Sequence, residues 1–131
     1  MTEDRKKVIL DTNFLLVPYC YRVDIFSELS STLSSGYDII LPSSTICELK
    51  SLSKRKGKEG LAAKLALKIL ELRKLEITVI ETNLKPDNWI LSFIQKEKAI
   101  ICTNDKELKK KIKRFGLNVI SLRSKSKLSL E

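Results

Sequence analysis

The alternation of short β-type segments with amphipathic segments constrains the fold of this chain more than any other feature of its sequence. Five short runs rich in β-forming residues have the length of buried strands, at residues 8–10, 38–41, 77–80, 99–102 and 119–122. Between them, apolar residues recur at helical spacing over residues 24–34, 43–54, 61–75, 87–97 and 106–115. Strands that alternate with helices pair in parallel within one sheet. The sequence therefore predicts an α/β fold with helices on both faces of a central parallel sheet of four to five strands.

The size and apolar pattern of the chain predict one domain that does not span a membrane. A length of 131 residues fits a single hydrophobic core. We expect one domain over residues 1–122 and a basic C-terminal tail over residues 123–131, which forms either an edge strand or a disordered end. No apolar run approaches the roughly 18 residues of a spanning helix, and the first residues lack the apolar core of a secretion signal. Three cysteines without paired spacing, each among apolar residues, suggest reduced, buried thiols, so we expect a cytoplasmic protein.

The charge balance and one missing residue type narrow the classes of function. The chain has 25 Lys and Arg against 16 Asp and Glu, a net charge of +9, which favours nucleic acid as a partner. A Lys-rich solubilising surface, or Lys and Glu enrichment for heat stability, would give the same composition. The chain has no histidine, which excludes His-based acid–base catalysis, Ser-His-Asp and Cys-His nucleophiles, and His-ligated zinc. An enzyme of this composition must use carboxylates, lysines, hydroxyls or a metal held by oxygen ligands.

Four acidic residues follow the carboxyl ends of predicted strands. Asp11 comes directly after the first strand, and Glu48 lies in the first turns of the helix after the second. Asp87 begins the helix after the third strand, and Asp105 follows the fourth. Taken singly, each could instead cap a helix or complement its dipole, and Thr45 and Glu48 have the spacing of a capping box. Because the carboxyl ends of parallel strands lie at one edge of a sheet, we expect all four acids to meet there.

Together these carboxylates indicate a metal site. Several carboxylates a few ångströms apart repel one another, and bound cations usually offset that cost. Without histidine or clustered cysteine, the donor set suits the hard cations Mg²⁺ or Mn²⁺, which support phosphodiester hydrolysis. Asn13, Thr103 and Asn104 are then candidates for contacts to the metal-binding carboxylates or to a substrate phosphate.

Two basic clusters accompany the acids. One occupies the helix that starts beside Asp105, and the other occupies the sequence SKRKGKEG at residues 53–60, which we expect to be a mobile surface loop. Most charge runs are simply solvated, but these adjoin the acids and could follow a phosphate backbone with little sequence specificity. The candidate RNA-binding residues are Lys54, Arg55, Lys56, Lys58, Lys106, Lys109, Lys110, Lys113 and Arg114, and Lys111 adds a further charge to the helix beside Asp105.

The apolar residues near these clusters are expected to pack inward. In the basic helix, Leu108, Ile112 and Phe115 form the predicted buried side. Tyr19 and Tyr21 could stack on bases, as could the single tryptophan, but we expect core packing for most aromatic residues.

These motifs resemble the PIN-domain family of ribonucleases. The resemblance covers nearly the whole chain, in family order and spacing, and lies in Leu10-Asp11-Thr12-Asn13, Pro42-Ser43-Ser44 leading to Glu48-Leu49, Asp87, and Ile100-Ile101-Cys102-Thr103-Asn104-Asp105. The closing run TNDKELKKKIKRFGLNVISL looks most like the PIN proteins of small-subunit ribosomal RNA processing. The resemblance to VapC-type toxins is more distant.

The resemblance implies a PIN-like three-layer α/β/α sandwich and Mg²⁺- or Mn²⁺-dependent cleavage of single-stranded RNA. It also implies a homodimer and, in the ribosomal RNA branch, ribosome-assembly factors as partners. Matched by position, Asp11, Glu48, Asp87 and Asp105 become the catalytic and metal-binding acids, with Thr103 as the neighbouring hydroxyl. The third acid of the family is often followed by a second acid, whereas asparagine follows Asp87 here, which leaves open a weakened or inactive nuclease.

Three alternatives remain open at this point. The chain could be a non-catalytic RNA-binding PIN module in ribosome assembly, or a VapC-like toxin that uses the same chemistry for growth arrest. A phosphate-binding α/β domain of flavodoxin-like class is disfavoured because the sequence contains no Gly-rich phosphate loop.

Overall fold

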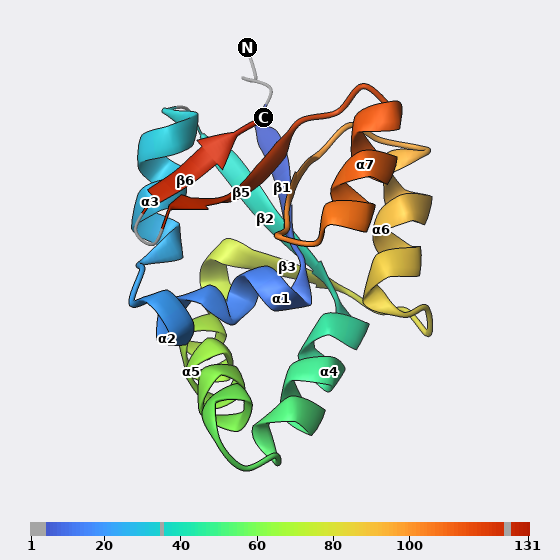
Figure 1. Cartoon of the computed structure of the whole chain (residues 1–131). Coiled ribbons are helices and arrows are strands. Elements are labelled where there is room, and N and C mark those ends of the chain that lie inside the picture. The colour runs from blue at the N-terminus through green and yellow to red at the C-terminus, as the bar shows by residue number, and fades with distance from the viewer. Residues whose placement is uncertain (1–4, 35, 125–126) are drawn as a thin grey trace.

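A single mixed sheet forms the centre of the molecule. The structure, a computed structural model, describes residues 5–34, 36–124 and 127–131, so the first residues of the predicted domain and residues 125–126 of the predicted tail lie outside the described residues. The described strands are β1 (Lys6–Leu10), β2 (Tyr37–Pro42), β3 (Ile77–Ile80), β4 (Ile100–Cys102), β5 (Val119–Ser124) and β6 (Lys127–Leu130). They are arranged in the order β3-β2-β1-β4-β5-β6 (Figure 1). All neighbours pair in parallel except β5 and β6, which are antiparallel.

Helices fill the connections between the parallel strands. They are α1 (Thr12–Leu15), α2 (Val17–Tyr21), α3 (Ile25–Leu33), α4 (Ser43–Ser53), α5 (Lys58–Leu72), the short 3-10 helix η1 (Lys74–Glu76), α6 (Pro86–Ile94) and α7 (Lys106–Arg114). The apolar stretch after Asn13, which contains a proline, forms part of α1 and α2. Within the described ranges, no helix has both the length and the apolar character needed to cross a membrane.

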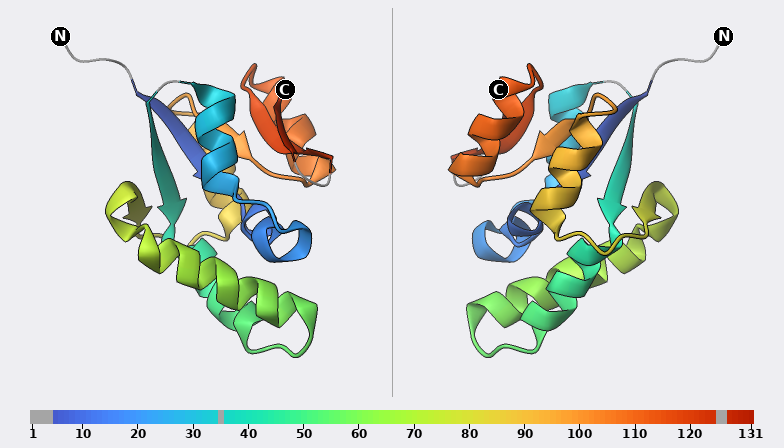
Figure 2. Two further views of the ribbon diagram at one scale, coloured as in Figure 1. Left: turned by 90° about the vertical axis from the view of Figure 1, so that its left-hand side faces the viewer. Right: turned by 90° about the vertical axis from the view of Figure 1, so that its right-hand side faces the viewer.

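The central strand β1 shows how the sheet divides the core into two layers. Val8 and Leu10 point to one face and pack with α1 to α5, whereas Ile9 points to the other and packs with α6 and α7. All three side chains are fully buried, as expected for a parallel strand covered on both sides. Figure 2 shows α3 in front of the sheet from one side and α6 in front of it from the other. This arrangement confirms the predicted α/β sandwich.

The C-terminal tail contributes a sixth strand to the sheet. Residues 127–130 form β6, so the sheet has one strand more than the four to five that the sequence predicts. Leu128 is 9% exposed and packs into the core beside α3. A four-residue strand is too short to show a clear alternation of apolar and polar residues in the sequence. Its formation depends on pairing with β5, which the sequence near residues 127–130 does not show. Of the two alternatives for the tail, the described residues therefore show the edge strand.

Helix α5 starts earlier than predicted and buries an unexpected face. It begins at Lys58 rather than Leu61, which shortens the predicted 53–60 loop to the turn between Ser53 and Lys58. Gly60 lies inside the helix. This position requires glycine, because a Cβ there would come within 1.9 Å of the Arg55 carbonyl oxygen. Glycine is a poor helix former, which explains the predicted later start. The buried positions are Gly60, Ala62, Ala63, Ala66 and Leu70, while Leu61 and Leu72 are exposed.

The prediction for the buried side of α7 is wrong at one residue. Leu108 and Ile112 are buried, as predicted, but Phe115 is 47% exposed. Phe115 is the C-cap of α7, and Gly116, with a φ of 75°, turns the chain away directly afterwards. The side chain of Phe115 therefore leaves the apolar stripe of the helix.

Candidate active site

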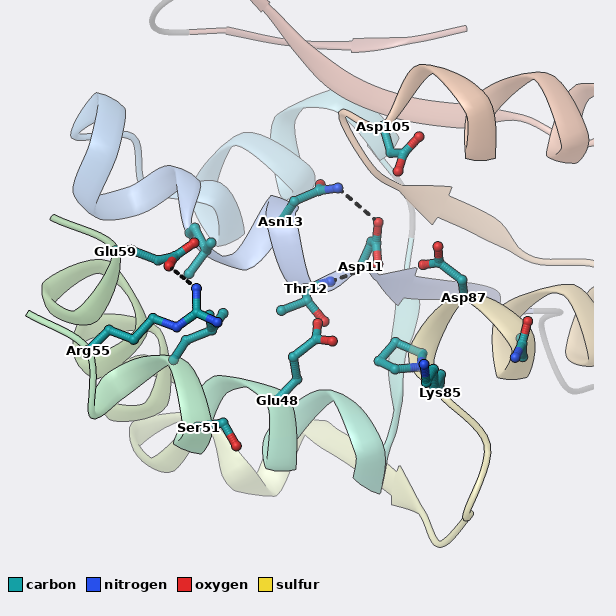
Figure 3. A pocket seen from close by; sticks show the side chains of 14 residues that line it. Asp11, Thr12, Asn13, Glu48, Ser51, Arg55, Glu59, Lys85, Asp87 and Asp105 are labelled. Atoms are coloured by element: carbon teal, nitrogen blue, oxygen red, sulfur yellow. Dashed lines mark hydrogen bonds and ion pairs between the residues drawn. The ribbon is translucent and has the colours of Figure 1, made fainter.

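Four carboxylates from four different strand–helix connections line one pocket of about 590 Å³. Asp11 follows β1, Glu48 lies on α4 after β2, Asp87 lies in the first turn of α6 after β3, and Asp105 follows β4. Figure 3 shows the Asp87 and Asp105 carboxylates on the same side of the pocket as Asp11, with Glu48 reaching up from α4. The parallel sheet thus brings together all four acids that the sequence selected, while their catalytic and metal-binding roles stay predictions.

Asp11 is the most constrained of these acids. It is 4% exposed, and its carboxylate accepts hydrogen bonds from the Thr12 backbone N–H at 2.9 Å, Asn13 Nδ2 at 3.1 Å and Thr103 Oγ1 at 2.7 Å. Burial raises the pKa of Asp11 from 3.8 to about 6. The Thr103 hydrogen bond opposes this rise, and the nearby Asp87 carboxylate adds to it. Ionised Asp11 is therefore held in place by dipoles but is costly to keep charged.

Two polar side chains donate to the same carboxylate oxygen, Oδ2, of Asp11. Thr103 is fully buried, donates its hydroxyl hydrogen to Asp11, and accepts the Asp105 backbone N–H at 3.1 Å. Asn13 donates its amide to Asp11 and accepts the Asn104 backbone N–H at 3.1 Å. Asn13 lines the pocket, whereas Thr103 lies behind Asp11. Thr103 can therefore act on a substrate only through the carboxylates that it orients.

The Asn104 side chain is engaged away from the pocket. Its Oδ1 accepts the Leu122 backbone N–H of β5 at 2.9 Å. This bond ties the loop after β4 to the neighbouring strand, so Asn104 is placed to position the loop rather than to contact a phosphate. The sequence suggested a phosphate contact because this asparagine follows a strand end, but its direction depends on β5.

The helix caps distinguish the acids from one another. The capping box that would have explained Glu48 without a functional role does not form, because α4 begins at Ser43 after Pro42, which makes no capping bond. Glu48 is exposed and free to face the pocket. Asp105 does cap α7, since its Oδ1 accepts the backbone N–H groups of the second and third helical residues at 2.9 and 3.1 Å. Its second oxygen makes no such bond, so capping and metal binding are compatible at Asp105.

Asp87 lies in a partly desolvated position among like charges. Desolvation raises its pKa, and the Asp105 and Glu48 carboxylates raise it further, whereas Lys111 lowers it. Lys85, the N-cap of α6, makes no side-chain capping bond, and Asp87 lies in the first turn, where its charge also complements the helix dipole. Its place in the pocket agrees with the predicted site even though asparagine follows it in the sequence.

The pocket contains polar groups that sequence reasoning did not assign a role. The Thr12 hydroxyl is buried and has no hydrogen-bond partner among the described residues, and Thr12 lines the same pocket as Glu48 (Figure 3). Lys85 lines the pocket at the start of α6. Glu59 adds a fifth acid from α5, paired with Arg55 at 2.6 Å. Thr12 could have been predicted, because it lies in the same DTN motif as Asp11. Glu59 could not, because it lies within α5 and does not follow the end of a strand.

The predicted basic residues divide between the pocket and other surfaces. Arg55 lines the pocket, Lys54 and Lys56 are exposed in the neighbouring turn, and Lys58 lines a different cleft beside α2. On α7, the exposed basic side chains are Lys106, Lys110, Lys111, Lys113 and Arg114.

Two α7 lysines face the C-terminal edge of the sheet instead. Lys109 Nζ and Lys113 Nζ lie 3.7 and 3.3 Å from carboxylate oxygens of Glu131. Lys111, by contrast, is close enough to Asp87 to lower the pKa of that acid. Of the basic residues on this helix, Lys111 is thus the one whose charge reaches the pocket most clearly.

The pocket's chemistry fits a hard divalent cation. Its donors are carboxylate and hydroxyl oxygens, the type that Mg²⁺ and Mn²⁺ prefer. In the described part of the chain, no three acidic or cysteine side chains are already gathered as a complete ligand set. Mg²⁺ needs only one or two carboxylates and keeps several waters, so a partial set is sufficient. The raised pKa values of Asp11 and Asp87 reflect burial and repulsion, which a cation relieves.

Comparison with known proteins places this arrangement in a family. Residues 8–125 match the family described as "PIN like domain". The chain is 35% identical to Ribonuclease VapC4 of Methanocaldococcus jannaschii over 123 residues, which cover 91% of this chain and 92% of the relative. It is 33% identical to Ribonuclease VapC9 of Archaeoglobus fulgidus over 124 residues, covering 94% and 87%.

Solved structures agree with this placement. The structure of the PIN domain endonuclease Utp24 superposes with a TM-score of 0.78 at 25% identity, covering 95% of this chain and 90% of that one. A domain of a functionally unknown protein from Methanocaldococcus jannaschii superposes with a TM-score of 0.64 at 20% identity, covering 91% and 92%, and shares the fold. The predicted resemblance is confirmed: this chain belongs to the PIN-like domain family.

Proposed function

We propose that the protein is a Mg²⁺- or Mn²⁺-dependent endoribonuclease that cleaves phosphodiester bonds of single-stranded RNA. The observation that carries the proposal is the convergence of Asp11, Glu48, Asp87 and Asp105 on one pocket from four separate connections. The VapC relatives, which are named ribonucleases, and the likeness to a PIN endonuclease support it. The net charge of +9 favours a polyanionic substrate.

Each carboxylate has a proposed part in the reaction. Asp11, Glu48 and Asp105 would hold the cation, and Asp87 would assist them. A divalent cation bound there would supply Lewis acidity toward water and a phosphate oxygen. Asp11 keeps its orientation through the three hydrogen bonds that it accepts, two of them from side chains.

The remaining polar groups of the pocket are placed to handle the phosphate. Thr12 lines the pocket, and its hydroxyl is shielded from solvent and has no hydrogen-bond partner among the described residues. It would bond a buried water that bridges to the phosphate. Lys85 and Arg55 bring positive charge to a pocket otherwise dominated by acids. Their cationic ends would hold the backbone on either side of the cleaved bond.

Cleavage of a labelled single-stranded RNA by the purified protein tests the proposal. We expect Mn²⁺-dependent products that disappear with EDTA and in the Asp11→Asn variant. Asp24→Asn is the matched control, because Asp24 is an exposed carboxylate that caps α3, and asparagine caps equally well. Tight RNA binding without cleavage by the wild-type protein would favour the non-catalytic RNA-binding module in ribosome assembly instead.

The proposed setting is ribosomal RNA processing in the cytoplasm, with ribosome-assembly factors and a second copy of the chain as partners. The closing sequence run and the likeness to Utp24 support this setting.

A second candidate is a VapC-like toxin ribonuclease, favoured by the two VapC relatives. Induced expression separates them, since growth arrest that Asp11→Asn abolishes favours the toxin and harmless expression favours processing. Light scattering of the purified protein tests the homodimer.

A further inference from the structure

A second cleft, of about 610 Å³, lies between α2 and α5, and its chemistry differs from that of the acidic pocket. Tyr19 and Tyr21 line it from α2, Arg22 lines it from the end of that helix, and Lys58 lines it from the first turn of α5. No carboxylate is among the described residues that line this cleft. It therefore combines two aromatic rings with two cations.

The cleft and the acidic pocket lie side by side across one helical turn. Consecutive residues of α5 divide between them, because Lys58 lines the cleft and Glu59 lines the pocket. The α1–α2 segment divides in the same way, with Leu16 on the pocket and Pro18 on the cleft. Helices α2 and α5 also pack directly against each other. A polymer chain that leaves the pocket on this side meets the cleft next.

The residues of the cleft are available to a ligand. Tyr21 is 46% exposed and Tyr19 is half-buried, so neither side chain is fully buried in the hydrophobic core. Arg22 has a left-handed backbone with a φ of 54°, which is uncommon for a residue other than glycine. This conformation ends α2 and leaves the Arg22 side chain at the wall of the cleft. A single exposed tyrosine is common on protein surfaces. Here two tyrosines lie beside two cations that pair with no acid among the described residues, a combination suited to binding a ligand.

We propose that this cleft is a nucleotide-binding subsite, in which Tyr19 and Tyr21 stack on a base of single-stranded RNA and Arg22 and Lys58 bind its phosphate. Aromatic stacking with flanking cations is how proteins hold single-stranded nucleic acid without reading sequence. The inference rests on the proposed function, since it takes RNA as the substrate. It also explains how an acidic pocket retains a polyanion, because the nucleotide beside the cleaved bond is held by positive charge.

The free cysteines allow a test on the unaltered protein. The prediction of buried thiols is right for Cys102 but wrong for Cys20 and Cys47. Cys20 is exposed in the cleft, whereas Cys47 is exposed on α4 and lines neither cavity. Alkylation by N-ethylmaleimide is followed at each cysteine by mass spectrometry, in EDTA, with and without a short oligouridylate. At an RNA concentration ten times its Kd, we expect Cys20 alkylation to slow by about tenfold and Cys47 alkylation to be unchanged. Equal rates at Cys20 with and without saturating RNA would overturn the proposal.

Substitutions test the two kinds of contact separately, with binding measured by fluorescence anisotropy in EDTA. Tyr21→Ala should weaken oligouridylate binding by about 5- to 100-fold, while Tyr21→Phe should stay within about twofold, because the ring alone stacks. Lys58→Gln should reduce the slope of log Kd against log salt by about 0.7, the loss of one phosphate contact to a single strand. Lys68→Gln is the matched control, since Lys68 is an exposed lysine of the same helix that lines neither cavity.

Cleavage with Mn²⁺ is measured on the same variants so that the two proposals can fail independently. Wild-type cleavage with unchanged RNA affinity in Tyr21→Ala and an unchanged salt slope in Lys58→Gln overturns the subsite and leaves the nuclease. Binding that depends on Tyr21 without any cleavage overturns the nuclease and leaves the subsite. A wild-type protein that neither binds nor cleaves the RNA overturns both.

Discussion

Replacing Asp11 by asparagine should stabilise the metal-free protein at neutral pH while abolishing its activity. The side chain is 4% exposed, and asparagine has nearly the same shape but carries no charge. The charge is the costly part of Asp11, because burial raises its pKa from 3.8 to about 6. A buried acid in the proposed metal-binding role is thus expected to lower the stability of the metal-free protein.

The size of the effect follows from the pKa shift. The unfolded carboxyl loses its proton near pH 4 and the folded one near pH 6, so ionisation increasingly favours the unfolded state across that window. Above about pH 6, the ionised Asp11 carboxylate lowers the free energy of unfolding by about 3 kcal/mol. Asparagine removes this cost, but its amide NH₂ must face at least one of the three donors that point at Asp11, at about 1 kcal/mol. The net gain is about 2 kcal/mol, or about 6–10 °C in Tm.

Thermal unfolding followed by circular dichroism in EDTA measures this gain. Asp11→Asn should unfold at a higher temperature than wild type at about pH 7. The advantage should vanish near pH 4, because the folded carboxyl is then protonated and the unfolded one is only partly ionised, so little of the ionisation cost remains. Asp24→Asn should stay within about 0.5 kcal/mol of wild type. Mn²⁺ should raise the wild-type Tm more than that of Asp11→Asn. The reasoning is refuted if Asp11→Asn is less stable than wild type at neutral pH, or if the difference is the same at both pH values.

Three further substitutions test the surroundings of the pocket. Thr103→Val should raise the pKa of Asp11 further, because it removes the hydroxyl that stabilises the carboxylate; NMR titration in EDTA measures this, and Thr103→Ser should restore the wild-type value. Gly60→Ala should lower the free energy of unfolding by about 1–3 kcal/mol in urea, since the new Cβ would meet the Arg55 carbonyl oxygen at 1.9 Å, and an unchanged stability would contradict the close contact. Asn104→Ala should cost about 1–3 kcal/mol by leaving a β5 backbone N–H without its acceptor, whereas Asn104→Asp, which keeps the oxygen, should cost less.

Local sequence determined the α/β architecture and which acidic residues line the pocket. Alternating apolar and amphipathic segments predicted the parallel α/β core, because strand and helix periodicities are properties of neighbouring residues. The rule that parallel strands end at one edge then brought Asp11, Glu48, Asp87 and Asp105 to the same place. The absence of histidine had already restricted the chemistry to oxygen ligands and cations.

Tertiary structure decided which way each polar side chain is engaged. Thr103 and Asn104 are neighbours in sequence, yet one holds Asp11 and the other holds β5. Lys109 and Lys111 lie on the same helix, yet one lies near Glu131 and the other influences an acid of the pocket. Sequence spacing sets directions within one element, but a contact between two elements depends on how they pack, and that packing involves residues far apart in the chain.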